Sequence, residues 1–116
     1  MSVFITGISI GKDESNNSCI EIIITAPLVK KYALNSFNSD VIFDCKYYAL
    51  GAKRYAKFMT LKAARCSCND YNILKTYFYT EKAERQESLK DFKKDINTAL
   101  QWLNQSVETL ILCKNN

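Results

Sequence analysis

The sequence contains no histidine and only three glycines and one proline among its 116 residues. Without histidine, Ser-His-Asp and Cys-His catalysis, zinc sites with imidazole ligands and a histidine-based pH switch are all excluded. The shortage of glycine and proline excludes collagen-like, linker-like and low-complexity chains. Because 47% of the residues are hydrophobic and 24% are charged, we expect a single globular domain spanning residues 1–116.

Long apolar runs are also lacking. Apolar runs such as Ile22-Ile23-Ile24 are never longer than four residues, far short of the ~18 residues that a membrane span needs. The first residues show neither the basic nor the apolar region of a secretory signal, and the cysteines are odd in number: Cys19, Cys45, Cys66, Cys68 and Cys113. We therefore expect a cytoplasmic protein whose reduced cysteines mostly pack as small apolar side chains.

Most of the chain shows the alternating pattern that is typical of β-strands. Residues 3–10 and 19–26 are rich in β-branched side chains and flank a turn-like segment, which predicts a hairpin ending at Pro27. A short helix is expected over residues 28–35, after the proline. Three further segments predict strands by the same alternation: 41–49, 54–65 and 72–80.

The last third of the chain predicts a long amphipathic helix over residues 88–113, with Ser88 at its start. Its apolar positions recur with helical spacing: Leu89, Phe92, Ile96, Ala99, Leu100, Leu103, Val107, Leu110 and Ile111. The predicted fold is α+β, an antiparallel meander of about five strands covered on one face by this C-terminal helix. The other face of the sheet would be open to solvent.

The net charge of +4 is concentrated in one part of the chain. Residues 41–66 contain six Lys or Arg and one acidic residue, Asp44, so this segment alone carries +5. On the outer face of the predicted sheet, cations alternate with aromatic rings: Lys46, Tyr48, Arg54, Phe58, Lys62, Lys75, Tyr77 and Tyr79. This face is the candidate binding surface.

Two functions fit such a surface. Tyr and Arg are enriched at protein interfaces, and Trp102, which lies off the apolar stripe of the predicted helix, is a further candidate partner contact or homodimer contact. The same cations and rings would also suit single-stranded nucleic acid. A purely structural role is the alternative, because edge-strand lysines and outward tyrosines are common in sheets, and Trp102 could pack against residues 27–40.

Metal binding and catalysis have weaker support. Cys66-Ser67-Cys68 resembles a ligand pair, but the other cysteines fall on separate predicted elements, so we predict no metal and no cofactor. Phosphate-binding glycine motifs and zinc-protease motifs are absent, and we do not expect an enzyme. The remaining enzymatic alternative is a histidine-free nuclease that uses Lys46, Tyr48, Arg54 or Tyr77 to bind a phosphodiester.

The abundance of Lys, Asn, Ile and Tyr indicates an AT-rich coding genome, such as that of a phage, a mobile element or a low-GC bacterium. Small single-domain proteins of such genomes often act by binding one macromolecule. We therefore expect a non-enzymatic inhibitor of the immunity-protein, antitoxin or phage anti-defence kind. It would bind a protein partner through the residues named above, with single-stranded nucleic acid as the alternative partner.

Overall fold

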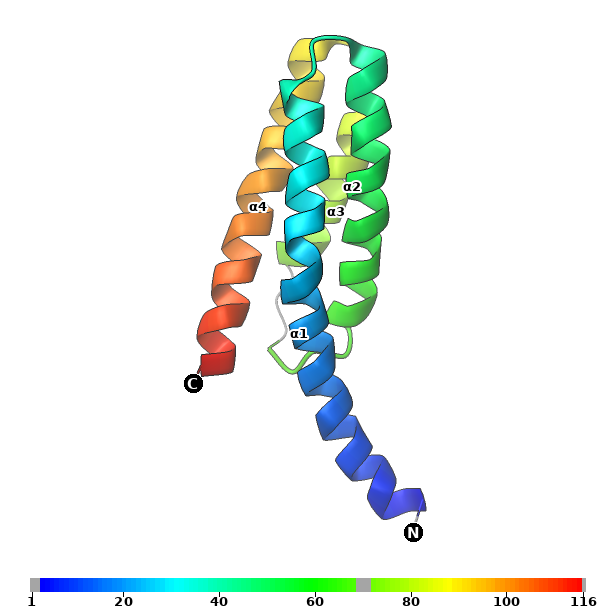
Figure 1. Cartoon of the computed structure of the whole chain (residues 1–116), viewed down its shortest axis with the longest axis vertical. Coiled ribbons are helices and arrows are strands. Elements are labelled where there is room, and N and C mark those ends of the chain that lie inside the picture. The colour runs from blue at the N-terminus through cyan, green and yellow to red at the C-terminus, as the bar shows by residue number, and fades with distance from the viewer. Residues whose placement is uncertain (1–2, 69–71, 116) are drawn as a thin grey trace.

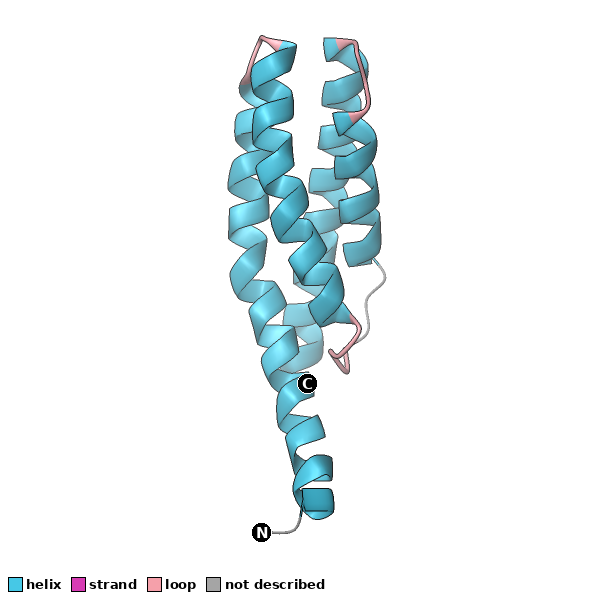
Figure 2. Cartoon of the chain, turned by 90° about the vertical axis from the view of Figure 1, so that its right-hand side faces the viewer, coloured by secondary structure: helices cyan, strands magenta, loops and turns pink. Residues whose placement is uncertain are grey.

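The computed structural model describes the backbone of residues 3–68 and 72–115 and the side chains of residues 15–68 and 72–114. These residues form four helices: α1 (Val3–Asn38), α2 (Ile42–Ala63), α3 (Asn72–Glu84) and α4 (Leu89–Asn115). The helices run alternately up and down along the long axis of a molecule measuring 57 × 26 × 17 Å (Figure 1). The first part of α1 continues beyond the end of the bundle (Figure 2).

The prediction of an α+β fold with a five-stranded meander is wrong, because the described residues contain no strand. The hairpin predicted from residues 3–10 and 19–26 and the short helix over 28–35 all belong to α1, and Pro27 lies inside that helix at an exposed position. The segments predicted as strands over 41–49 and 54–65 belong to α2, and 72–80 belongs to α3.

Each helix buries one stripe of residues spaced alternately three and four positions apart. The stripes are Cys19, Ile22, Ala26, Val29, Ala33 and Ser36 on α1; Cys45, Ala49, Ala52, Ala56, Met59 and Ala63 on α2; Ile73, Thr76, Thr80 and Ala83 on α3; and Phe92, Ile96, Ala99, Leu103, Ser106 and Leu110 on α4. This spacing keeps each stripe on one side of its helix, which is the packing geometry of antiparallel four-helix bundles. Small side chains on α2 let its backbone approach its neighbours closely.

The predicted C-terminal helix is confirmed, since the expected span of 88–113 matches α4 within two residues at each end. The Ser88 hydroxyl oxygen accepts a hydrogen bond of 3.1 Å from the Asp91 backbone N–H. This bond satisfies one of the amide groups that the first turn of a helix leaves without a partner. Ser88 therefore caps α4, as its sequence position predicts.

Four of the five cysteines form two disulfides, so the prediction of reduced cysteines is wrong for these four residues. Cys19 of α1 is bonded to Cys66, which follows α2, and Cys68 is bonded to Cys113 near the end of α4. Cys45 is the free thiol, and it is buried and donates a hydrogen bond of 3.3 Å to the Ser39 carbonyl oxygen.

Within the part of the chain that the structure describes, no helix has both the length and the apolar character needed to cross a membrane. Disulfides persist mainly in oxidising compartments. The cytoplasmic location therefore stays a prediction, and the two disulfides give it no support.

Candidate partner-binding face

Helix α2 is apolar on two opposite faces. Its small residues point into the bundle, whereas a second set of large side chains points outward; we call this set the outer stripe, and it consists of Phe43, Tyr47, Leu50, Arg54, Phe58 and Leu61. At ~100° per residue, these six positions lie within an arc of about 80°, and the buried stripe is centred about 180° away. The outward face is thus a distinct surface and no extension of the core.

Several members of the outer stripe are strongly exposed. The exposed fractions are 76% for Phe43, 68% for Tyr47 and 63% for Leu61, while that of Phe58 is 38%. A solvated helix face is normally polar, and a contiguous exposed apolar patch is typical of an interaction site. The stripe runs about 27 Å along the helix, at 1.5 Å per residue from position 43 to position 61.

Basic side chains border the outer stripe. Helix α2 carries five Lys or Arg and one acidic residue, Asp44, which is a net charge of +4. Two of the lysines form ion pairs: Lys53 Nζ lies 2.8 Å from Glu84 Oε1 of α3, and Lys62 Nζ lies 3.3 Å from Glu21 Oε2 of α1. Among the described residues, Arg54 and Lys57 form no ion pair, and both are exposed, Arg54 within the stripe and Lys57 beside it.

A groove of about 590 Å³ lies beside the outer stripe, between α1 and α2. Its lining comprises Thr25, Tyr32, Gly51, Arg54, Tyr55 and Phe58. Tyr32 and Tyr55 stack with their ring centroids 5.8 Å apart, and the Tyr32 ring lies directly against Gly51. Because Arg54 and Phe58 belong both to the groove and to the stripe, the two features form one continuous surface.

The structure brings together only part of the predicted binding surface. Arg54 and Phe58 lie in the outer stripe, and Lys46 and Lys62 flank it on opposite sides, with Lys62 Nζ 5.3 Å from the centre of the Phe58 ring. Tyr48 points about 120° away from the centre of the stripe, at ~100° per residue, and is half-buried. The prediction that Tyr48 shares this face is wrong because it assumed a two-residue period.

The predicted residues on α3 and α4 contact side chains of these two helices. Lys75 Nζ of α3 lies 4.0 Å from the centre of the Trp102 ring of α4, so half-buried Trp102 packs toward α3. Tyr77 donates a hydrogen bond of 3.2 Å to Glu81 Oε2. The pKa of Tyr77 is raised, mainly by burial and to a smaller extent by this hydrogen bond. Tyr79 packs edge-on against Phe78. These four predicted residues therefore do not join the outer stripe.

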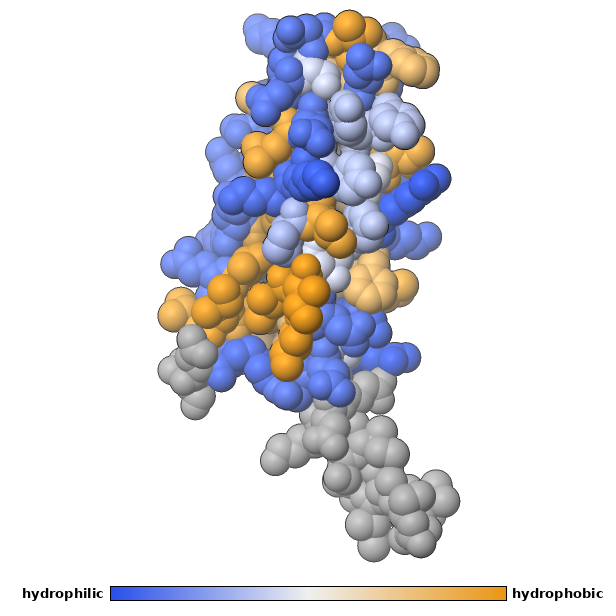
Figure 3. Space-filling model, viewed as in Figure 1, coloured by the Kyte–Doolittle hydropathy of each residue, from blue (hydrophilic) through white to orange (hydrophobic). Residues whose placement is uncertain are grey.

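A second apolar groove, of about 520 Å³, lies between α1 and α4. Apolar side chains of both helices line it, including Ile23, Pro27, Leu103 and Val107, with Lys30 and Glu108 also in the lining. Figure 3 shows an apolar patch over these two helices, toward the end of the bundle where the C-terminus lies. This groove lacks the basic border of the outer stripe, and no charge pattern indicates an occupant.

Sequence reasoning missed Phe43, Tyr47 and Leu61 as surface residues. The alternating pattern placed Phe43 and Tyr47 on the same face as Cys45, but in the helix Cys45 is buried and its two neighbours are exposed. The signal that could have found them is the spacing of the small residues Cys45, Ala49, Ala52 and Ala56. That spacing marks an inner face, which leaves the aromatic residues on the opposite one.

Comparisons of this chain with known protein families, with curated proteins and with solved structures find no match.

Proposed function

We propose that this protein is a binding module whose outer stripe on α2 docks an acidic amphipathic helix of a partner protein. The observation that carries this proposal is the second apolar face of α2, where Phe43, Tyr47 and Leu61 are mostly exposed. Helix-in-groove recognition uses anchors at spacings of three and four residues, and the outer stripe offers that spacing over its whole length. The adjacent groove at Tyr32 and Gly51 offers a pocket for one partner side chain.

The charge around the stripe selects the kind of partner. A partner helix with carboxylates beside its apolar stripe would face Lys46, Arg54 and Lys57 with opposite charge, which favours association and orients the complex. A second copy of this chain docking α2 against α2 would place +4 against +4. Charge repulsion therefore disfavours a homodimer through this face.

Nucleic acid is the competing partner. The described residues contain no sheet face that could carry a single strand. Lys75 contacts Trp102, and Tyr77 and Tyr79 contact side chains of their own helix, α3. The aromatic members of the outer stripe and the cations named beside them all belong to one helix, α2. We therefore favour a protein partner and treat nucleic acid as an outcome of the test.

The test compares two double variants in affinity capture from cells that produce the protein. Phe43→Asp with Leu61→Asp changes the stripe, and Ile24→Asp with Leu74→Asp is the matched control, because those side chains are 66% and 46% exposed on α1 and α3. We expect a partner that wild type and control retain and the stripe variant loses. The partner would then be purified, and its contacting helix would be made as a synthetic peptide. Both should bind the stripe variant at least about tenfold more weakly than wild type.

Four results would overturn the proposal. The first is that every captured protein binds the stripe variant as well as wild type. The second is that the contact maps to a basic or non-helical element of the partner. The third is tight, strongly salt-dependent binding of a single-stranded 20-mer that Arg54→Ala and Lys57→Ala weaken, which would establish the nucleic-acid alternative. Light scattering completes the test, since a dimer that Phe43→Asp dissociates would identify a second copy as the occupant.

A further inference from the structure

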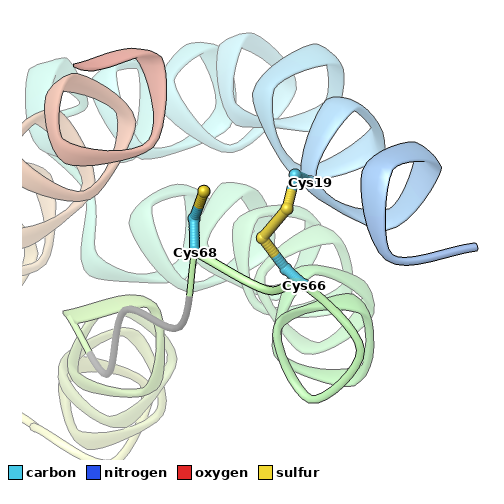
Figure 4. Close-up of side chains that lie close together, drawn as sticks. All are labelled: Cys19, Cys66 and Cys68. Atoms are coloured by element: carbon cyan, nitrogen blue, oxygen red, sulfur yellow. A yellow bond between two sulfur atoms is a disulfide. The ribbon is translucent and has the colours of Figure 1, made fainter. Parts of the chain in front are cut away.

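Four cysteines from distant parts of the chain meet at one end of the bundle. Cys19 comes from α1, Cys66 and Cys68 from the segment after α2, and Cys113 from the last turns of α4. The Sγ atoms of Cys19, Cys66 and Cys68 all lie within 4.8 Å of one another, and Figure 4 shows the Cys68 side chain beside the Cys19–Cys66 disulfide. Cys113 joins this cluster through its bond to Cys68. We call these four residues the cysteine cluster.

A hydrogen bond and the positions of the helices also hold the cluster together, besides the sulfur bonds. The Ser67 N–H, between Cys66 and Cys68, donates a hydrogen bond of 2.8 Å to Ser15 Oγ of α1. The Cα atoms are 4.9 Å apart for Cys19 and Cys66, and 6.0 Å apart for Cys68 and Cys113. When the disulfides are reduced, the packing of the helices would therefore keep four thiols close together.

Three of these sulfur atoms lie at mutual distances that suit one metal ion, and the fourth, that of Cys113, is bonded to Cys68. A tetrahedral zinc ion with Zn–S bonds of ~2.3 Å places its sulfur ligands about 3.8 Å apart, and rotation of cysteine side chains covers the difference from 4.8 Å. An all-sulfur tetrahedral set selects a soft or borderline metal, and it excludes magnesium and calcium, which require oxygen ligands. The absence of histidine from the sequence leaves the four-cysteine type as the zinc site open to this chain.

We propose that the reduced protein binds one Zn²⁺ through Cys19, Cys66, Cys68 and Cys113. A dithiol reductant supplies two electrons and two protons to each disulfide and becomes a cyclic disulfide itself, leaving four thiols. Binding of Zn²⁺ then forms four Zn–S bonds and releases four protons to solvent. The cysteine cluster thus closes the same end of the bundle in either environment, by two disulfides when oxidised and by zinc when reduced.

This proposal differs from the sequence-based prediction of no metal. That prediction placed Cys19, Cys45 and Cys113 on predicted elements separate from the Cys66-Ser67-Cys68 pair. In the helical bundle, α1 brings Cys19 to the connection after α2 (Figure 4), and α4 brings Cys113 to Cys68. The proposal is independent of the outer stripe, whose members lie on a different surface.

The experiment uses the full chain, reduced with a phosphine under nitrogen and freed of reductant. Titration with Co²⁺ alone should produce the visible bands of a tetrahedral thiolate complex, and Zn²⁺ should abolish them at one ion per chain. At a pH below the thiol pKa values, the release of four protons per Zn²⁺ gives an independent count of the ligands. Zn²⁺ should also raise the melting temperature of the reduced protein.

Matched single variants identify the ligands. Cys66→Ser and Cys113→Ser should each weaken Zn²⁺ binding by more than about tenfold, the loss that follows from disturbing even an outer-shell group. Cys45→Ser is the control, because Cys45 is a buried thiol about 30 Å along α2 from Cys66, at 1.5 Å per residue. It should bind Zn²⁺ like wild type.

The proposal is overturned if reduced wild type shows no tetrahedral Co²⁺ bands or if Cys113→Ser binds Zn²⁺ as tightly as wild type. It is overturned equally if Cys45→Ser weakens binding as much as Cys66→Ser, since a disordered chain would then be chelating the metal. Circular dichroism decides whether a variant has unfolded. The rise in melting temperature on adding Zn²⁺, present in wild type and absent from Cys113→Ser, keeps the test decisive even when the reduced chain folds only with metal.

Discussion

A methyl group added to Gly51 of α2 would lie 2.7 Å from Cδ1 of Tyr32 of α1. Replacing a helical glycine by alanine ordinarily stabilises a helix by about 1 kcal/mol. Here the overpacking against the Tyr32 ring costs about 1–3 kcal/mol, so we expect Gly51→Ala to lower the free energy of unfolding by about 1 kcal/mol. Urea denaturation measures this change.

The sign of the same substitution should reverse when the ring is removed. In a Tyr32→Ala background the three atoms nearest to the added methyl group are gone, and Gly51→Ala should stabilise the protein by up to about 1 kcal/mol. A stabilising Gly51→Ala in the presence of Tyr32 would show that the ring moves aside without cost.

Ser106 of α4 has a buried hydroxyl without a hydrogen-bond partner among the described residues. Because an unsatisfied buried hydroxyl costs about 1–3 kcal/mol, Ser106→Ala should raise the free energy of unfolding by about 1 kcal/mol. The control is Ser36→Ala, since the Ser36 hydroxyl is also buried but donates a hydrogen bond of 2.8 Å to the Cys45 carbonyl oxygen. That variant should lose about 1 kcal/mol, and equal effects of the two substitutions would contradict the prediction.

The two disulfides should differ in accessibility to reductant. Their sequence separations of 47 and 45 residues are nearly equal, so the loss of chain entropy assigns each about 4 kcal/mol of stability. Cys19 and Cys66 are buried, whereas Cys113 is exposed. With limiting dithiothreitol and a chelator, alkylation and mass mapping should find Cys68 and Cys113 first. Earlier labelling of Cys19 and Cys66 would refute this order.

The buried thiol of Cys45 should make the protein sensitive to alkaline pH. Burial raises the pKa of Cys45 above its ordinary value of 9.0. Because the folded state binds this proton more tightly than the unfolded state, the protonated thiol contributes to the free energy of unfolding. This contribution is complete below about pH 9 and is lost as the pH rises through the pKa of the folded state. Wild type should therefore lose more stability than Cys45→Ser as the pH rises above about 9. Parallel loss in both proteins would exclude this origin.

The sequence predicts α4 but not the other helices, and the reason lies in how each helix divides its polarity. The outward side of α4 is mainly polar, so the spacing of Phe92, Ile96 and Leu103 stands out. On α2 the outward side is aromatic and the inward side is mostly alanine. Hydrophobicity alone therefore does not distinguish the buried face of α2 from the exposed one. The alternation of Ile20, Ile22 and Ile24 on α1 is likewise accidental, because only Ile22 is buried.

The candidate surface could be predicted in composition but not in geometry. The positive charge of residues 41–66 falls mostly on α2, and the predicted residues Arg54 and Phe58 belong to the outer stripe. With the helical period, Tyr48 lies outside the outer stripe, whereas Phe43, Tyr47 and Leu61 lie in it. The convergence of the cysteines depends on tertiary structure, because no local pattern brings Cys19 and Cys113 to Cys66-Ser67-Cys68.

The pairing of the cysteines divides the chain into two covalent rings that do not overlap. One ring closes on α1 and α2 and the other on α3 and α4, and Ser67 is the residue between them. Each helical hairpin would thus survive separation from the other as a closed unit, held to it by one short stretch of backbone. Two molecules could exchange whole hairpins by changing the backbone angles around Ser67, without breaking a single disulfide.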